Sequence, residues 1–260
     1  MKQLYSILSI ALACSAYGQS DLPDHGNACV NAQENEIPLP ENHPARLELR
    51  ALEKAFSEQG IPTHESKSLC DPTIPVVFHI VDQNPNKVTD AQVESAMEIL
   101  NRDFNKQNFE IGSLHPDFEP IAADVAIQFK LAQKDPNGNP TTGIVRVVAD
   151  GLCYSTAGGG NIANNCPVKL TSPAWNTNNY LNIWIVNDPF GGTTNATTGS
   201  GWAFRAESVP NLTYGEDGIV YNHRFLGTTG SSDAATFLGD MTRVLTHEVG
   251  HYLNLRHTFE

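Results

Sequence analysis

Several segments of the chain have the apolar patterns of β-strands. Pro75–Val81 and Leu181–Val186 are nearly continuous apolar runs, which is typical of strands covered on both faces. Asp124–Leu131 instead alternates, and this predicts a half-buried strand with Val125, Ile127, Phe129 and Leu131 pointing inward. Shorter strands are predicted at Gly143–Val148, Gly201–Arg205 and Gly218–Tyr221.

Helical periodicity marks three further segments. Ala45–Gln59 repeats leucines at helical spacing and is ended by Gly60. Thr89 and Gln92 form a capping-box pattern, which predicts a helix with Val93, Met97, Leu100 and Phe104 on one face. A last helix is predicted from about Asp240 to Leu253, with Val244, Leu245 and Val249 on its buried side. Strands precede this late helix, so we expect an α+β fold with a twisted, mixed sheet backed by two long helices.

The first 71 residues have the composition of segments that precede a mature domain. An apolar run from Leu4 to Ala16 follows Lys2, which is typical of a secretory signal peptide with a cut near Gly18. Residues 19–71 are polar and rich in breakers up to Cys70-Asp71-Pro72, so we expect a pro-segment there. The sequence therefore predicts a secreted protein whose main domain covers residues 72–260.

The composition narrows the range of partners. The chain has 260 residues and a formal net charge of -13, which argues against a nucleic-acid partner because such a partner requires a basic face. Some of these carboxylates could bind Ca²⁺, although a solvated acidic surface explains most of them. The N-terminal apolar run is too short to span a membrane, and no other segment is a candidate.

Three histidines near the C-terminus have the spacing of a catalytic zinc site. His247 and His251 are four residues apart and share one face of the predicted helix, and His257 follows after a chain reversal. Three imidazoles and one open position are typical of catalytic zinc, and Glu248 beside the first histidine can act as general base. The reversal requires a left-handed residue after Leu253, and Asn254 is the residue type that tolerates it best after glycine.

These residues resemble the metzincin pattern H-E-x-x-H-x-x-G-x-x-H, with Asn254 in place of the glycine. Val244–His247 and His257-Thr258-Phe259, together with the segments Asn182–Val186 and Asp217–Val220, are similar to the pappalysin family. The resemblance implies a metzincin-like upper subdomain and a secreted zinc endopeptidase made as a zymogen, often supported by Ca²⁺. It also implies that His247, His251 and His257 are the ligands and Glu248 the base.

The resemblance leads us to expect that part of the cleft lies outside this chain. Metzincins carry a methionine-containing turn beneath the zinc after the third histidine, whereas the methionines here are Met1, Met97 and Met241. We therefore expect a catalytic domain without its lower C-terminal subdomain. A non-catalytic zinc-binding or adhesive module remains the alternative to a protease, although pure metal binding does not require Glu248.

The cysteines and one predicted strand are further candidate functional residues. Cys14 leaves with the signal peptide, and Cys153 and Cys166 flank a glycine-rich loop and are the best disulfide pair. Cys29 could pair with Cys70, or its thiolate could occupy the fourth zinc position and hold the enzyme latent. The predicted edge strand at Trp202, Ala203 and Phe204 could pair with an extended protein or peptide substrate.

Overall fold

The computed structural model describes residues 72–150, 167–189, 200–203, 218–234, 241–255 and 257. Within them, six strands form one mixed sheet in the order β2-β1-β4-β6-β5, and β3 also pairs with β1. The strands are β1 (Thr73–Asp82), β2 (Gln128–Leu131), β3 (Ile144–Val148), β4 (Leu181–Val186), β5 (Gly201–Ala203) and β6 (Ile219–Asn222). All pairs are parallel except β5 with β6. The predicted signal peptide, pro-segment and Ala45–Gln59 helix lie outside the described residues.

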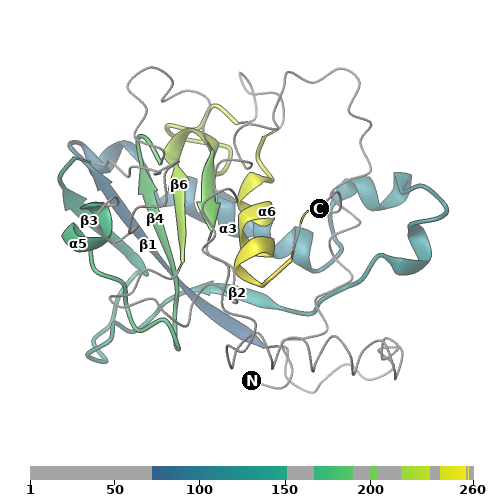
Figure 1. The fold of residues 1–260 in the computed structure, drawn as a ribbon, viewed down its shortest axis with the longest axis horizontal. Helices are drawn as coiled ribbons and strands as arrows, with labels where there is room; N and C mark the ends of the chain where they lie inside the picture. Colours follow the sequence, from purple (N-terminus) through teal and green to yellow (C-terminus); the bar gives the residue numbers. More distant parts are fainter. Residues whose placement is uncertain are drawn as a thin grey trace, which may run out of the picture.

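Two helices cover one face of the sheet, and a third lies on the other (Figure 1). The first two are α3 (Asp90–Phe104) and α6 (Val244–Tyr252), and the third is the short α5 (Pro167–Thr171). The described connections contain four short 3-10 helices: η2 (Pro85–Lys87), η3 (Phe109–Ser113), η4 (Glu119–Ile121) and η6 (His223–Phe225). No helix among the described residues is long and apolar enough to cross a membrane.

Alternation along the strands builds a core on each face. On β1, Phe78 and Ile80 face α3 and α6, whereas Val81 faces α5. The first face also receives Leu245 and Val249 of α6, which are buried as the helical pattern predicts. On the second face, Trp184 and Trp202 pack with α5. Burial on both faces explains why β1 and β4 have almost continuous apolar sequences.

Several predicted element boundaries were wrong. The strand predicted from Asp124 begins only at Gln128, because Ala126 adopts a φ of +53° and its N–H donates to Asp124 Oδ1. The last helix is shorter than predicted and covers nine residues, so α3 is the one long helix in the described part of the chain. The β6 strand begins one residue later than predicted. Phe204 and Arg205 of the predicted Gly201–Arg205 strand lie outside the described residues, and β5 covers the rest of it.

The predicted capping box is present only in part. Thr89 caps α3 as predicted, since its side chain accepts a hydrogen bond from the Gln92 N–H. The Gln92 side chain does not return to Thr89; it is fully buried and contacts the segment that follows β6. The buried Gln92 amide therefore joins distant parts of the fold in addition to being part of a helix start.

His79 is a structural histidine in the core on the α5 side of the sheet. Its ring is fully buried and stacks on Trp184 with centroids 5.1 Å apart. The Asn182 side-chain oxygen lies 3.0 Å from Nε2 and accepts its proton, so Nδ1 accepts from the Ser172 hydroxyl at 2.9 Å. Burial lowers the pKa of His79 to about 4; the Asn182 hydrogen bond opposes this and the Lys169 charge adds to it.

We predict that His79 makes the fold less stable in mild acid. In the unfolded chain the His79 ring is protonated near pH 6.5, whereas in the folded chain it is protonated only near pH 4. The contribution of the neutral ring to the free energy of unfolding is therefore fully present above pH 6.5 and is lost as the pH falls towards 4. The loss is about 3 kcal/mol for this residue. The free energy of unfolding, measured with urea across this pH range, should change less with pH in His79→Gln than in the wild type. The exposed His115→Gln is the control, and parallel curves for His79→Gln and wild type would contradict the prediction.

Candidate metal centre

The α6 helix presents two of the three predicted metal ligands. His247 and His251 lie one turn apart, and their Nε2 atoms are 2.9 Å from each other. The opposite side of the helix is fixed in the core by Leu245 and Val249. The amphipathic pattern of α6 therefore turns both imidazoles towards the same point outside the core.

A Schellman motif at the end of α6 brings in the third histidine. The Asn254 N–H donates to His251 O at 2.8 Å, and the Leu255 N–H donates to Gly250 O at 2.9 Å. Asn254 adopts a φ of +73°, the left-handed conformation that this turn requires. Leu255 then packs in the core, and the chain reaches His257 two residues later.

The same turn fixes the proton position on His251. Its Nδ1 lies 2.8 Å from Leu255 O, and a carbonyl can only accept, so Nδ1 carries the proton. The Nε2 atom of His251 is therefore left with a lone pair that points towards the other two rings. The backbone carbonyl of the turn thus determines both the ring orientation and the tautomer of His251.

The three Nε2 atoms form a compact donor set. His257 Nε2 lies 3.0 Å from Nε2 of both His247 and His251, and all three residues are partly buried. Burial, together with the two neighbouring histidines, lowers the pKa of His247 to about 3, so its ring is neutral at physiological pH. Neutral imidazoles at this spacing fit a cation with nitrogen ligands at about 2.0–2.1 Å, as Zn²⁺ has.

Of the other predicted functional residues, the structure describes Glu248, Trp202 and Ala203. Glu248 follows His247 on α6 and is only 2% exposed. Trp202 and Ala203 lie on β5, at the edge of the described sheet; Trp202 is buried, and its Nε1 donates to Pro189 O at 2.9 Å. Phe204, Cys29, Cys70, Cys153 and Cys166 lie outside the described residues.

The histidine triad is the one group of its kind in the described part of the chain. A search there for three or more His, Cys, Asp or Glu side chains able to share a metal ion finds His247, His251 and His257 alone. The Ca²⁺ site expected from the acidic composition has no such cluster there. His223 is also not a ligand among these residues, since its Nδ1 lies 2.9 Å from the Ser231 hydroxyl.

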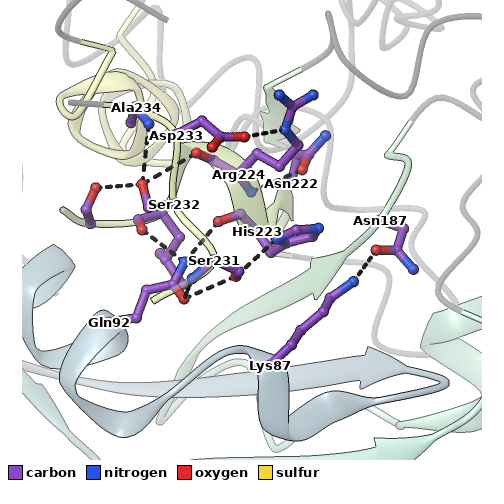
Figure 2. Close-up of polar contacts among 12 residues, drawn as sticks. Lys87, Gln92, Asn187, Asn222, His223, Arg224, Ser231, Ser232, Asp233 and Ala234 are labelled. Carbon is purple, nitrogen blue, oxygen red and sulfur yellow. Dashed lines mark hydrogen bonds and ion pairs between the residues drawn. The ribbon is translucent and has the colours of Figure 1, made fainter. Parts of the chain in front are cut away.

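Sequence reasoning missed the contacts that hold the segment between β6 and α6. The buried Gln92 amide donates to His223 O at 2.8 Å and to Leu226 O at 3.0 Å (Figure 2). Its oxygen accepts from both the N–H and the hydroxyl of Ser231, so all of its hydrogen-bonding capacity is used. A glycine at position 230 permits this approach, because a Cβ there would lie 2.6 Å from Gln92 Oε1.

A second missed group joins α3 to α6. The Asp103 carboxylate accepts from the Thr246 hydroxyl at 2.8 Å and from Arg243 Nε at 2.9 Å. These residues are 140 and 143 positions apart, so no local sequence pattern could connect them. In the sequence, the only available signal would have been an aspartate near the end of the helix predicted from Thr89.

Comparisons with known proteins agree with this geometry. The peptidase M43 family, described as pregnancy-associated plasma protein-A, matches residues 165–260. Mature mirolysin from Tannerella forsythia, solved with a cleaved peptide, is 34% identical to this chain, and the two structures match with a TM-score of 0.56. The match covers 73% of this chain and 65% of the mirolysin chain. The chain belongs to the pappalysin family of metalloproteases. The predicted resemblance and the metzincin-like α+β fold are thereby confirmed.

Two further pappalysin structures extend the match. A promirolysin mutant from Tannerella forsythia is 28% identical with a TM-score of 0.61, over 88% of this chain and 68% of that chain. Mirolysin in complex with compound 9 is 33% identical with a TM-score of 0.54, over 73% and 65% of the two chains. The chain thus spans less than two thirds of the mature mirolysin chain, at 65% of its length. No match was found among curated protein sequences.

We predict that glycine at position 254 preserves the turn and alanine strains it. The left-handed conformation has no steric cost for glycine, and the Asn254 side-chain oxygen is buried without a hydrogen-bond partner among the described residues. Asn254→Gly should therefore match or exceed the thermal stability and zinc affinity of the wild type. Asn254→Ala should lose about 1 kcal/mol of stability and bind zinc more weakly. Equal zinc affinity in the Ala and Gly variants would show that the turn does not control the site.

Proposed function

We propose that this chain is the precursor of a secreted zinc endopeptidase, with its active centre at the C-terminal end of the described sequence. One observation carries the proposal: three Nε2 atoms converge within 3.0 Å of one another beside a buried glutamate. The chain would comprise a signal peptide at 1–18, a pro-segment at 19–71 and the catalytic domain from 72 onward. The promirolysin match supports the precursor form.

The residues would divide the chemistry as follows. His247, His251 and His257 would hold Zn²⁺, which when bound supplies a Lewis acid for the scissile carbonyl and lowers the pKa of a water. Glu248 would accept the proton of the attacking water and pass it to the leaving amine. The position of Glu248 supports this role, because it follows His247 directly on α6 and its side chain is removed from bulk water.

The substrate would be an extended protein segment. Mirolysin has been solved with a cleaved peptide, which supports a peptide substrate for the present chain as well. The β5 strand lies against α6, and the sheet as described ends at β5. An extended chain added at this edge would run next to the metal centre. Burial of Trp202 and its hydrogen bond to Pro189 O support a scaffolding role for this side chain.

We predict that replacement of Glu248 separates hydrolysis from metal binding. Glu248→Gln keeps the size of the side chain and removes the base, so chelator-sensitive hydrolysis of casein should fall by about 10²–10⁴-fold. Zinc content, measured by atomic absorption, should remain at one per chain. His251→Ala is the matched control on the same helix face and should lose both zinc and activity.

The same experiment distinguishes a protease from a zinc-binding or adhesive module. Both functions predict bound zinc in the wild type, but only the protease predicts a difference between wild type and Glu248→Gln. A wild-type chain with its pro-segment removed that holds zinc and hydrolyses no protein substrate would leave the non-catalytic module as the function.

A further inference from the structure

The α6 helix begins without a cap from its own sequence. Its N-cap residue is Arg243, and no side-chain cap hydrogen bond forms there among the described residues. The first turn, Val244-Leu245-Thr246, also lacks an acidic residue. An N-cap side chain and an acidic residue in the first turn usually stabilise this end, and a nine-residue helix has few other hydrogen bonds to keep it in place.

A carboxylate from α3 binds two side chains at the start of α6. Asp103 is 1% exposed in its side chain, and its Oδ2 accepts from both Arg243 Nε and the Thr246 hydroxyl. Arg243 and Thr246 are the N-cap and the third residue of α6, so the negative charge lies at the positive end of the helix dipole. Arg243 Nη1 also lies 3.2 Å from Glu110 Oε1, which ties α6 to η3.

The hydrogen bonds to Asp103 are directional, whereas Leu245 and Val249 contact the core through apolar packing. Leu245 and Val249 bury the helix, but apolar packing has no preferred angle about the helix axis. Charge-assisted hydrogen bonds require a narrow geometry, so a rotation of α6 would stretch both bonds to Asp103. Asp103 is therefore the group best placed to fix the rotation of α6 about its own axis.

This rotation decides where the metal ligands and the general base point. His247 and Glu248 follow Thr246 directly, each turned by about 100° around the helix from the one before. A rotation of about 20° would move an imidazole nitrogen, about 6 Å from the axis, by about 2 Å. Such a displacement equals a whole Zn–N bond length, so the site would not tolerate it.

We propose that Asp103 is a positioning residue for the metal centre, acting through Thr246 and Arg243 on the orientation of His247 and Glu248. The inference rests on the proposed function for its catalytic consequence, but its consequence for metal binding can be measured without any substrate. Asp103 itself touches neither the ligand nitrogens nor the reacting atoms.

The test compares two identical substitutions on α3 in the full chain. Asp103→Asn keeps the shape and removes the charge, and Asp90→Asn is the control, since Asp90 is exposed and pairs only with Arg146 in the described contacts. Zinc affinity is measured by chelator competition, and ligand geometry by the visible absorption of the Co²⁺-loaded protein. Asp103→Asn should weaken zinc binding by about 10–100-fold and alter the Co²⁺ spectrum, and Asp90→Asn should do neither.

A second pair of variants covers the case in which Asp103→Asn does not fold. Thr246→Val removes one hydroxyl while keeping the branched shape, and Thr246→Ser keeps the hydroxyl. We expect Thr246→Val to lower the zinc affinity and kcat with little change in KM, and Thr246→Ser to restore both. A loss of stability alone, with kcat, zinc affinity and Co²⁺ spectrum unchanged well below the unfolding temperature, would overturn the proposal.

The outcomes also distinguish this inference from the proposed function. Wild-type protein that fails to bind zinc would refute the proposed function. Wild-type protein that binds zinc and cleaves peptides, with folded Asp103→Asn and Thr246→Val indistinguishable from it, would refute the positioning role alone.

Discussion

The metal centre depends on a backbone reversal that occupies Leu253, Asn254 and Leu255. The reversal reuses the last free carbonyls of α6, because Asn254 and Leu255 donate to His251 O and Gly250 O. It also presents Leu255 O to Nδ1 of His251 at 2.8 Å. One turn therefore ends the helix, sets the tautomer of His251 and returns the chain so that His257 reaches the other two histidines. A helix that continued past Tyr252 would carry His257 away from the other two rings.

The short helix that carries two ligands is held at each end by a different kind of interaction. The C-terminal end is fixed by backbone hydrogen bonds of the turn, and the N-terminal end by the buried carboxylate of Asp103. Between them, Leu245 and Val249 supply non-directional burial against the sheet. This division explains how a helix of nine residues is held in place at both ends and along its buried side.

Local patterns predicted the parts of this structure that arise from neighbouring residues. The β4 strand was predicted with its correct bounds, and the α3 start at Thr89 and the left-handed Asn254 also agree with the structure. The late start of the strand predicted at Asp124–Leu131 was missed, since it depends on one backbone angle at Ala126. Asp103 and Gln92 were missed because their partners are more than a hundred residues away, and buried polar pairing over that distance has no periodic signature.

Glu248 provides the physical argument for chemistry over simple metal binding. Three neutral imidazoles suffice to hold Zn²⁺, and a glutamate beside them adds nothing to the ligand set. A carboxylate at 2% exposure loses most of its hydration, which is unfavourable unless it is compensated locally. The role that we propose for this buried acid beside His247 is that of a proton acceptor at the metal.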